Sequence, residues 1–248
     1  MNIDNVSFKY PGSKNYALKN VSLFIENGQK VAIVGANGSG KTTLVKLICG
    51  LYDVTKGSIT INDTVVTARN RNEFGKWLSA VFQDFSLLAL PIGNNISAGK
   101  LYDESKVWKA LEKVGIREKI EKYPEKLEQS LFKDYDDDGV ELSGGEAQKI
   151  AIARGIYKDA ALIILDEPTA ALDPFAEYEI FTKMNDLSQD KTTIFISHRL
   201  YSCKFCDKVI VMDGGEIVQV GTHYELVKIK GRYSAVSYTH LRAHETRG

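Results

Sequence analysis

The stretch GANGSGKT at residues 35–42 decides the fold, because it matches the pattern G-x-x-x-x-G-K-[ST]. A short apolar segment at residues 30–34 comes before it, and a segment with helical apolar spacing at residues 42–49 follows it. Glycines let backbone N–H groups converge on phosphate oxygens, and the N-terminus of the next helix attracts the same anion. The order strand, glycine-rich loop and helix therefore predicts a phosphate-binding loop.

Two side chains of this loop carry chemistry of their own. Lys41 supplies a point charge to the β- and γ-phosphates of a nucleotide, and Thr42 offers a hydroxyl to Mg²⁺. ATP and Mg²⁺ are therefore the expected cofactors. The nucleotide-binding residues predicted in and beside the loop are Gly35, Asn37, Gly38, Ser39, Gly40, Lys41, Thr42 and Thr43.

A second site element is the apolar run ALIILDE at residues 161–167, which ends in two carboxylates. A buried strand presents Asp166 at its C-terminal end, where open α/β sheets bind ligands. An acidic side chain there can hold Mg²⁺. Glu167 should point to the other side of the pleat and polarise a water molecule. The alternative, a strand end that merely meets solvent, is disfavoured once the phosphate loop is present in the same chain.

The rest of the chain divides into strand-rich and helical parts. Short apolar strands are predicted near both ends, with turns at Asn27-Gly28 and at residues 213–215 that read as hairpins. From about residue 96 to residue 156 the helical period dominates, as in the stripe Val107, Leu111 and Val114. Strands alternating with helices predict an α/β fold with a mostly parallel sheet, and the helical middle reads as an insertion.

Composition narrows the function classes. The 248 residues carry 32 basic and 32 acidic side chains, so the formal net charge is zero and gives no support for nucleic-acid binding. No run approaches the roughly 18–20 apolar residues of a membrane span, and no signal peptide is visible. The three cysteines fit a reducing compartment. The chain as given is predicted to be soluble and cytoplasmic.

The segment LSGGEAQ at residues 142–148 resembles the signature motif of ATP-binding cassette (ABC) proteins. The segment again predicts a helix N-terminus. Ser143 caps this helix, and Gly144 and Gly145 expose its backbone donors. Other positions resemble family motifs in the same order. They are the adenine-stacking aromatic Tyr10, the glutamine Gln83 between two lobes, the interface residue Asp173 and the switch histidine His198.

The resemblance covers about residues 1–234 and implies a P-loop NTPase (RecA-like) core with a small antiparallel β subdomain and an inserted α-helical subdomain. The core is expected at about 1–85 and 158–234, and the helical subdomain at about 86–157. It also implies an ATPase with Glu167, His198, Lys41 and Gln83 as catalytic residues. The implied Mg²⁺ ligands are Thr42, Gln83 and Asp166.

The same resemblance implies partners and a location. Two cassettes would face each other head to tail, so that Ser143, Gly144 and Gly145 serve the nucleotide of the partner. The exporter branch fits better than the importer branch, although a short Glu-Arg-Gly element common in exporters is replaced around residues 136–141. The expected location is the cytoplasmic face of the cell membrane, beside a transmembrane domain. The apolar loop at residues 85–91 is either its docking patch or an ordinary core segment.

Two rival functions stay open at this point. One is a soluble cassette ATPase outside transport, and the other is a degenerate cassette that binds ATP as a structural partner. Three of the predicted site residues also have a purely structural interpretation. It is a strand-end aromatic for Tyr10, a surface residue for Gln83 and a helix-cap histidine for His198. The pair Cys203 and Cys206 is expected to be structural rather than redox-active or zinc-binding.

The last residues stand apart from the rest. Residues 235–248 resemble translated adapter sequence and are predicted to be non-native, which argues against a metal site at His240 and His244. The membrane domain is therefore expected on a missing part of a longer chain, or else on a separate subunit. The transported substrate is not encoded in these residues.

Overall fold

The computed structural model describes residues 1–99, 101–133, 137–168, 182, 191–197, 202–229 and 231–233. The chain forms two compact units. The first combines Met1–Leu78 with the described residues from Lys191 onward, and the second is Ser79–Asp190. Each unit is described on its own below.

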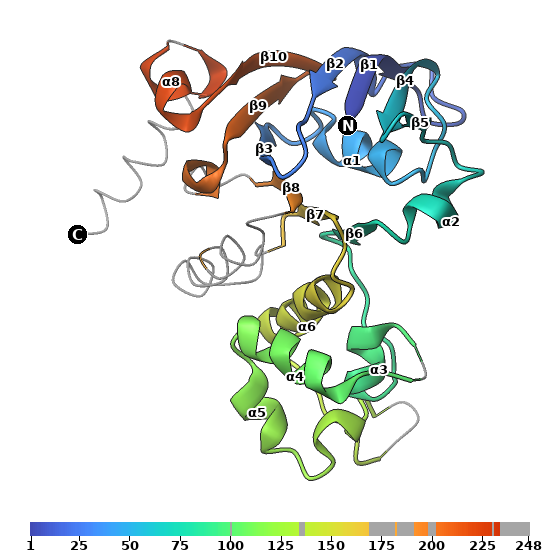
Figure 1. The fold of residues 1–248 in the computed structure, drawn as a ribbon, viewed down its shortest axis with the longest axis vertical. Helices are drawn as coiled ribbons and strands as arrows, with labels where there is room; N and C mark the ends of the chain where they lie inside the picture. Colours follow the sequence, from blue (N-terminus) through green and yellow to red (C-terminus); the bar gives the residue numbers. More distant parts are fainter. Residues whose placement is uncertain are drawn as a thin grey trace. The chain divides into compact units, whose positions relative to one another are not determined.

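The first unit contains an antiparallel sheet with the strand order β2-β1-β4-β5 (Figure 1). Its strands are β1 (Asn2–Phe8), β2 (Leu18–Phe24), β4 (Lys56–Ile61) and β5 (Thr64–Val65). Leu18, Val21 and Leu23 of β2 are buried, while the residues between them are exposed. Alternating burial of this kind is what a sheet with one core face and one wet face requires. The expected small antiparallel β subdomain is therefore present.

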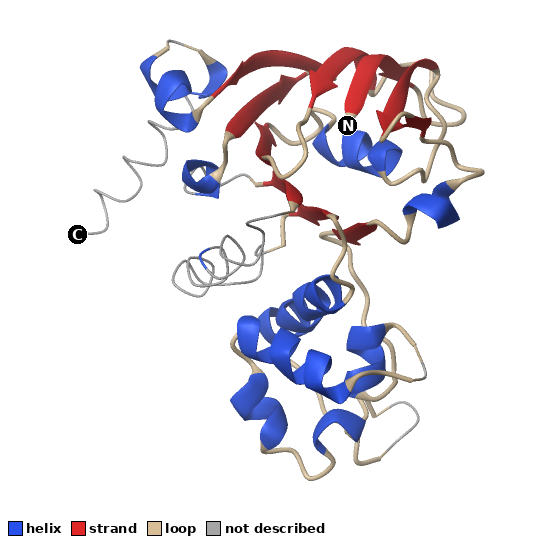
Figure 2. Cartoon of the chain, viewed as in Figure 1, coloured by secondary structure: helices blue, strands red, loops and turns tan. Residues whose placement is uncertain are grey.

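The first unit also contains strands in the order β10-β9-β3-β8, drawn in red in Figure 2. These are β3 (Lys30–Gly35), β8 (Thr192–Ile196), β9 (Lys208–Asp213) and β10 (Glu216–Gly221). β3 pairs in parallel with both β8 and β9, and β10 pairs antiparallel with β9. β8 is buried along its whole length, as expected for a central parallel strand.

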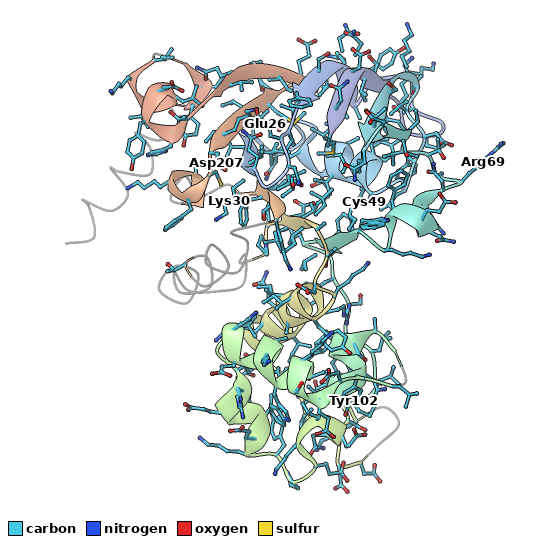
Figure 3. All side chains as sticks on the ribbon, viewed as in Figure 1. Glu26, Lys30, Cys49, Arg69, Tyr102 and Asp207 are labelled. Carbon is cyan, nitrogen blue, oxygen red and sulfur yellow. The ribbon has the colours of Figure 1, made fainter. Side chains whose placement is uncertain are left out.

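The start of β3 is anchored to the start of β9. The backbone N–H of Lys30 donates to the Oδ2 of Asp207 at 2.8 Å, and the N–H of Asp207 donates to the carbonyl of Lys30 at 2.8 Å (Figure 3). The helical elements of this unit are α1 (Lys41–Ile48), α2 (Arg71–Phe74), η2 (Ser202–Phe205) and α8 (His223–Lys228). The anchored strand β3 leads directly into the phosphate loop.

The second unit is mostly helical. Its elements are β6 (Leu78–Val81, which starts one residue before the unit), α3 (Ile92–Ser97), α4 (Glu104–Lys113), α5 (Arg117–Glu121), η1 (Lys126–Glu128), α6 (Gly144–Tyr157) and β7 (Leu162–Asp166). α3 and α4 pack on α6, and the predicted stripe Val107, Leu111 and Val114 is buried. β7 lies beside β6. This unit holds the helical insertion.

Two sequence predictions about turns have different outcomes. The turn at residues 213–215 joins the antiparallel pair β9 and β10, as predicted. The hairpin predicted at Asn27-Gly28 is wrong, because β2 pairs with β1 whereas β3 pairs with β8 and β9. The turn is real, but it passes the chain from one sheet to the other. Which strands pair with each other depends on tertiary packing, and a local turn signal does not report it.

None of the helices in the described part of the chain is both long enough and apolar enough to cross a membrane. The lobe boundaries expected at residues 85–86 and 157–158 stay a prediction.

Candidate functional site

The phosphate loop leaves the end of β3 through a position that admits only glycine. A Cβ on Gly35 would lie 2.2 Å from the carbonyl oxygen of Met212 and 2.7 Å from the Oγ of Ser39. A Cβ on Gly40 would lie 2.7 Å from the Cδ2 of Leu18, and Gly40 has φ +102. The glycines of the motif therefore allow the loop to pass directly against the neighbouring backbone.

Helix α1 begins without a side-chain cap. Gly40 is the N-cap residue and offers no side-chain cap, and the first turn contains no acidic residue. The unpaired N–H groups at such a helix start, together with the helix dipole, attract anions. Helix α1 therefore presents an anion-binding end at the loop.

Lys41 brings a positive charge into this loop. Its side chain is buried, and its Nζ donates to the carbonyl oxygens of Gly35 and Ala36 at 3.0 Å each. The Oγ of Ser39 is buried and has no hydrogen-bond partner among the described residues. A buried hydroxyl without a partner is costly, and a phosphate oxygen would satisfy it. Ammonium, hydroxyl and helix N–H groups together fit the triphosphate that the sequence predicts.

The loop is supported from behind by the turn between β9 and β10. The backbone N–H of Gly215 donates to the carbonyl of Ser39 at 3.1 Å. A Cβ on Gly215 would lie 2.7 Å from the carbonyl oxygen of Ala17. Sequence reasoning identified this turn as a hairpin but missed its contact with the loop. The two adjacent glycines were the only local signal for such a close approach.

Tyr10 reaches the loop from the end of the first strand. Its hydroxyl shares a hydrogen bond of 3.1 Å with the Oγ1 of Thr43. Its ring packs edge to face against Phe8 at 4.9 Å and Tyr52 at 5.4 Å between centroids. The structure therefore brings together two residues that the sequence assigned to nucleotide binding. Sequence reasoning missed the supporting rings of Phe8 and Tyr52, which no motif marks.

The signature segment begins α6 in the second unit. Ser143 is its N-cap, with a capping box in which the Ser143 Oγ accepts from the N–H of Glu146. Ser143 and Gly144 are exposed, so this helix end is open to solvent. The predicted cap is confirmed, and the helix end has the geometry of a second anion-binding position.

The two carboxylates lie at the end of β7. Asp166 is its last residue and is buried, whereas Glu167 follows the strand with φ +49 and is half-buried. The Nε2 of Gln148, on α6, donates to the carbonyl of Glu167 at 3.4 Å. A non-glycine residue in left-handed backbone is uncommon and is frequent at functional sites. Gln83 is exposed in the loop after β6, the neighbouring strand.

The predicted site residues are therefore spread over both units. The phosphate loop with Tyr10 and Thr43 belongs to the first, and Gln83, Ser143, Asp166 and Glu167 belong to the second. Asp173 and His198 lie outside the described residues, as does the segment 235–248. Among the described residues, no group of three or more His, Cys, Asp or Glu side chains has the arrangement of a metal site.

Cys203 and Cys206 are buried in the first unit, and neither forms a disulfide. Burial raises the pKa of Cys206, and Cys203 and Asp207 raise it further. A protonated, enclosed thiol is unreactive. This agrees with the structural role expected for the pair.

Comparisons with known proteins agree with this geometry. The family model for the ABC transporter matches residues 18–170. The subtilin transport ATP-binding protein SpaT of Bacillus subtilis is 43% identical over 90% of this chain and 37% of its own length. The nisin transport ATP-binding protein NisT of Lactococcus lactis is 39% identical over 95% of this chain and 40% of its own.

A solved structure supports the same assignment. A bacterial Atm1-family ABC exporter with ATP bound superposes with a TM-score of 0.88 at 31% identity, over 97% of this chain and 42% of that one. The chain thus spans well under half the length of these relatives. The chain belongs to the ABC transporter family, and its fold is the P-loop ATPase fold of that family.

Proposed function

We propose that the chain binds and hydrolyses ATP and that this reaction drives export of a substrate across a membrane. The observation that carries the proposal is the phosphate loop, in which Lys41, the partnerless Ser39 hydroxyl and the uncapped start of α1 converge. The relatives named above are transport ATP-binding proteins, which points to the same activity.

The proposed roles follow from the chemistry of each group. Lys41 leaves the two loop carbonyls that it now contacts and holds the β- and γ-phosphates. Glu167 takes a proton from the attacking water, and Gln83 and His198 orient the water and the γ-phosphate. Phosphoryl transfer in such a site depends mainly on positioning and on charge stabilisation.

Mg²⁺ fits the oxygen donors that the chain provides. Thr42 offers a hydroxyl, Gln83 an amide oxygen and Asp166 a buried carboxylate, the ligand types that this ion prefers. When bound, the ion would neutralise charge on the β- and γ-phosphates. The residues Tyr10, Gly35, Asn37, Gly38, Gly40 and Thr43 complete the proposed nucleotide contacts on the same cassette.

We propose that two cassettes act as a head-to-tail dimer. Ser143, Gly144 and Gly145 would bind the nucleotide held by the partner's phosphate loop, with Asp173 at the interface. The exposed start of α6 supports this, because its donors face solvent in a single chain. A lone chain should then hydrolyse ATP poorly.

We propose a transmembrane domain as the second partner, which places the cassette at the cytoplasmic face of the membrane. Leu88 and Leu90 are 57% and 44% exposed in the loop after Gln83. Buried Asn95 holds this loop, accepting from the N–H of Leu88 at 2.9 Å and donating to the carbonyls of both leucines at 3.0 Å. Arg154 also donates to the carbonyl of Ser86. The loop is thus braced with apolar side chains outward, which suits docking of cytoplasmic helices.

The test is ATP hydrolysis by the assembled transporter that carries this cassette, in lipid, with Mg²⁺. Lys41→Ala should abolish hydrolysis, while Lys46→Ala on the same helix α1 should keep it. Hydrolysis that persists in Lys41→Ala would refute the site. Hydrolysis without movement of any solute or lipid in vesicles would refute export and favour a cassette ATPase outside transport.

A further inference from the structure

The carboxylate of Glu146, near the start of α6, has both oxygens engaged. Its Oε2 accepts from the backbone N–H of Ser143 at 2.9 Å, which closes the capping box. Its Oε1 accepts from the Nζ of Lys119 on α5 at 2.7 Å. The carboxylate of Glu146 therefore links Lys119 to Ser143, the residue that caps α6.

This carboxylate stands at a position where negative charge has two opposite effects. A carboxylate in the first turn stabilises a helix, because it complements the positive end of the dipole. In the proposed function, however, the same helix end must accept the γ-phosphate of the partner's ATP. Two anions at one helix terminus repel each other, and the donors that the phosphate needs are partly satisfied by Glu146.

We infer that Lys119 is a positioning residue for the partner's nucleotide, because its ammonium neutralises Glu146 and thereby keeps the start of α6 receptive to the γ-phosphate. Lys119 does so from α5, without touching the phosphate. The inference rests on the proposed head-to-tail dimer.

Both side chains are charged near neutral pH. The hydrogen bond that Lys119 donates to Glu146 is the main cause that raises the pKa of Lys119, against a smaller opposing effect of burial. Partial burial acts to raise the pKa of Glu146, but its hydrogen bonds to Lys119 and Ser143 together outweigh burial and lower it. The Lys119–Glu146 pair therefore carries no net charge at the pH at which ATP is hydrolysed.

The competing explanation is an ordinary structural ion pair. The side chains of Lys119 and Glu146 are 40% and 27% exposed, and pairs with this exposure contribute little to stability. The two explanations predict different relative effects for the two substitutions. If the pair only ties α5 to α6, loss of either partner should impair the protein in the same way. If Lys119 compensates charge, loss of Lys119 and loss of the Glu146 charge should act in opposite directions.

The experiment compares five variants of the assembled transporter in lipid: Lys119→Met, Lys119→Arg, Glu146→Gln, the double variant of Lys119→Met with Glu146→Gln, and Lys122→Met as a matched control. Lys122 is an exposed lysine at the end of the same helix α5. Gln at position 146 can still accept the N–H of Ser143, so the capping box survives without the charge. The readouts are the Mg·ATP concentration at half-maximal hydrolysis and the affinity for ADP, which lacks a γ-phosphate.

We expect Lys119→Met to raise the half-saturating ATP concentration about three- to ten-fold, as an uncompensated charge at a helix terminus would. Glu146→Gln should lower it, the double variant should return to within about two-fold of the parent, and Lys119→Arg should behave like the parent. ADP affinity should stay unchanged throughout, because ADP is held by the phosphate loop of its own cassette.

The outcomes separate this inference from the function on which it rests. A parent transporter without ATP hydrolysis would refute the proposed function itself. An active parent in which Lys119→Met and Glu146→Gln shift the ATP dependence in the same direction would overturn the inference alone. An active parent in which Lys119→Met behaves like Lys122→Met would overturn it as well.

Discussion

The hydroxyl of Tyr10 lies 3.1 Å from the Oγ1 of Thr43, so a residue just past the end of β1 is hydrogen-bonded to the first turn of α1. These residues are 33 positions apart in the sequence. Edge-to-face contacts with Phe8 and Tyr52 hold the same ring from two sides. The aromatic proposed to stack on adenine is therefore positioned relative to the phosphate loop by contacts within the chain.

This tether can be tested with Tyr10→Phe, which keeps the ring and removes the hydrogen bond. A net loss of about 1 kcal/mol should raise the KM for ATP about five-fold with little change in kcat. Tyr10→Ala should raise KM further, because the stacking surface is gone as well. Tyr16→Phe, in the same connection between β1 and β2, is the control. If Tyr10→Ala left KM unchanged, Tyr10 would be only a strand-end aromatic.

Glu167→Gln tests the proposed general base. The substitution removes the proton acceptor and keeps the size of the side chain, so kcat should fall about 100-fold or more. ATP binding should persist, and the cassettes should remain together as an ATP-bound dimer, measured by crosslinking or size in the presence of Mg·ATP. Turnover close to that of the parent would show that Glu167 is not the base.

We propose that each ATP site combines the phosphate loop of one cassette with the start of α6 of the other. This can be tested by placing two defects on the same cassette or on opposite cassettes. Lys41→Ala disables a phosphate loop, and Ser143→Arg blocks an α6 terminus by size and charge. With a trans interface, one defect on each cassette leaves one intact site, whereas both defects on one cassette leave none. We therefore expect partial hydrolysis in the first arrangement only. The reverse pattern would show that each site is built within one chain.

The close packing of the phosphate loop predicts a stability difference between two glycine positions. Gly40→Ala should lower the free energy of unfolding by about 2–4 kcal/mol, because the left-handed backbone is strained and the Cβ meets Leu18. Gly12→Ala is the matched control, since Gly12 has φ +78 with nothing within 4 Å of its Cβ. It should cost only about 1 kcal/mol of backbone strain. Equal losses in denaturant titrations would argue against the clash.

A pH effect on stability is expected from His223, at the start of α8. Burial lowers its pKa and Lys204 lowers it further, while its Nδ1 lies 2.6 Å from the hydroxyl of Tyr233. In the unfolded chain this histidine should titrate near its ordinary pKa of about 6.5. Below that pH the unfolded state binds more protons than the folded state, so stability should fall as the pH falls. Unfolding measured from pH 7.5 to 5 should show a shallower decline for His223→Gln than for the parent. An unchanged slope would show that another group controls it.

Local sequence signals were sufficient to predict the elements whose structure depends on residues close together in the chain. The strand, loop and helix around residues 30–48 were predicted because glycine spacing and apolar periodicity act within a few residues. The cap of α6 at Ser143 was equally readable, since an N-cap bonds only to its own first turn. The stripe of Val107, Leu111 and Val114 is buried for the same reason of helical spacing.

Other features depend on residues that are distant in sequence. The turn at Asn27-Gly28 looked like a hairpin, but the sheet to which β3 belongs is decided by its pairing with β8 and β9. The contact of Gly215 with the phosphate loop and the rings around Tyr10 have no motif. Prediction from a single sequence misses such contacts because the tertiary fold, and not closeness in the sequence, creates them.

By itself, the sequence determined that residues 35–42 form a phosphate-binding loop, because that loop is built from its own backbone and the helix that follows it. The tertiary structure decided what surrounds the loop: Met212 and Gly215 behind it, and Tyr10 tethered to Thr43 beside it. It also decided that Lys119 meets Glu146, because these residues are distant in the sequence and only the folded chain brings α5 to the start of α6.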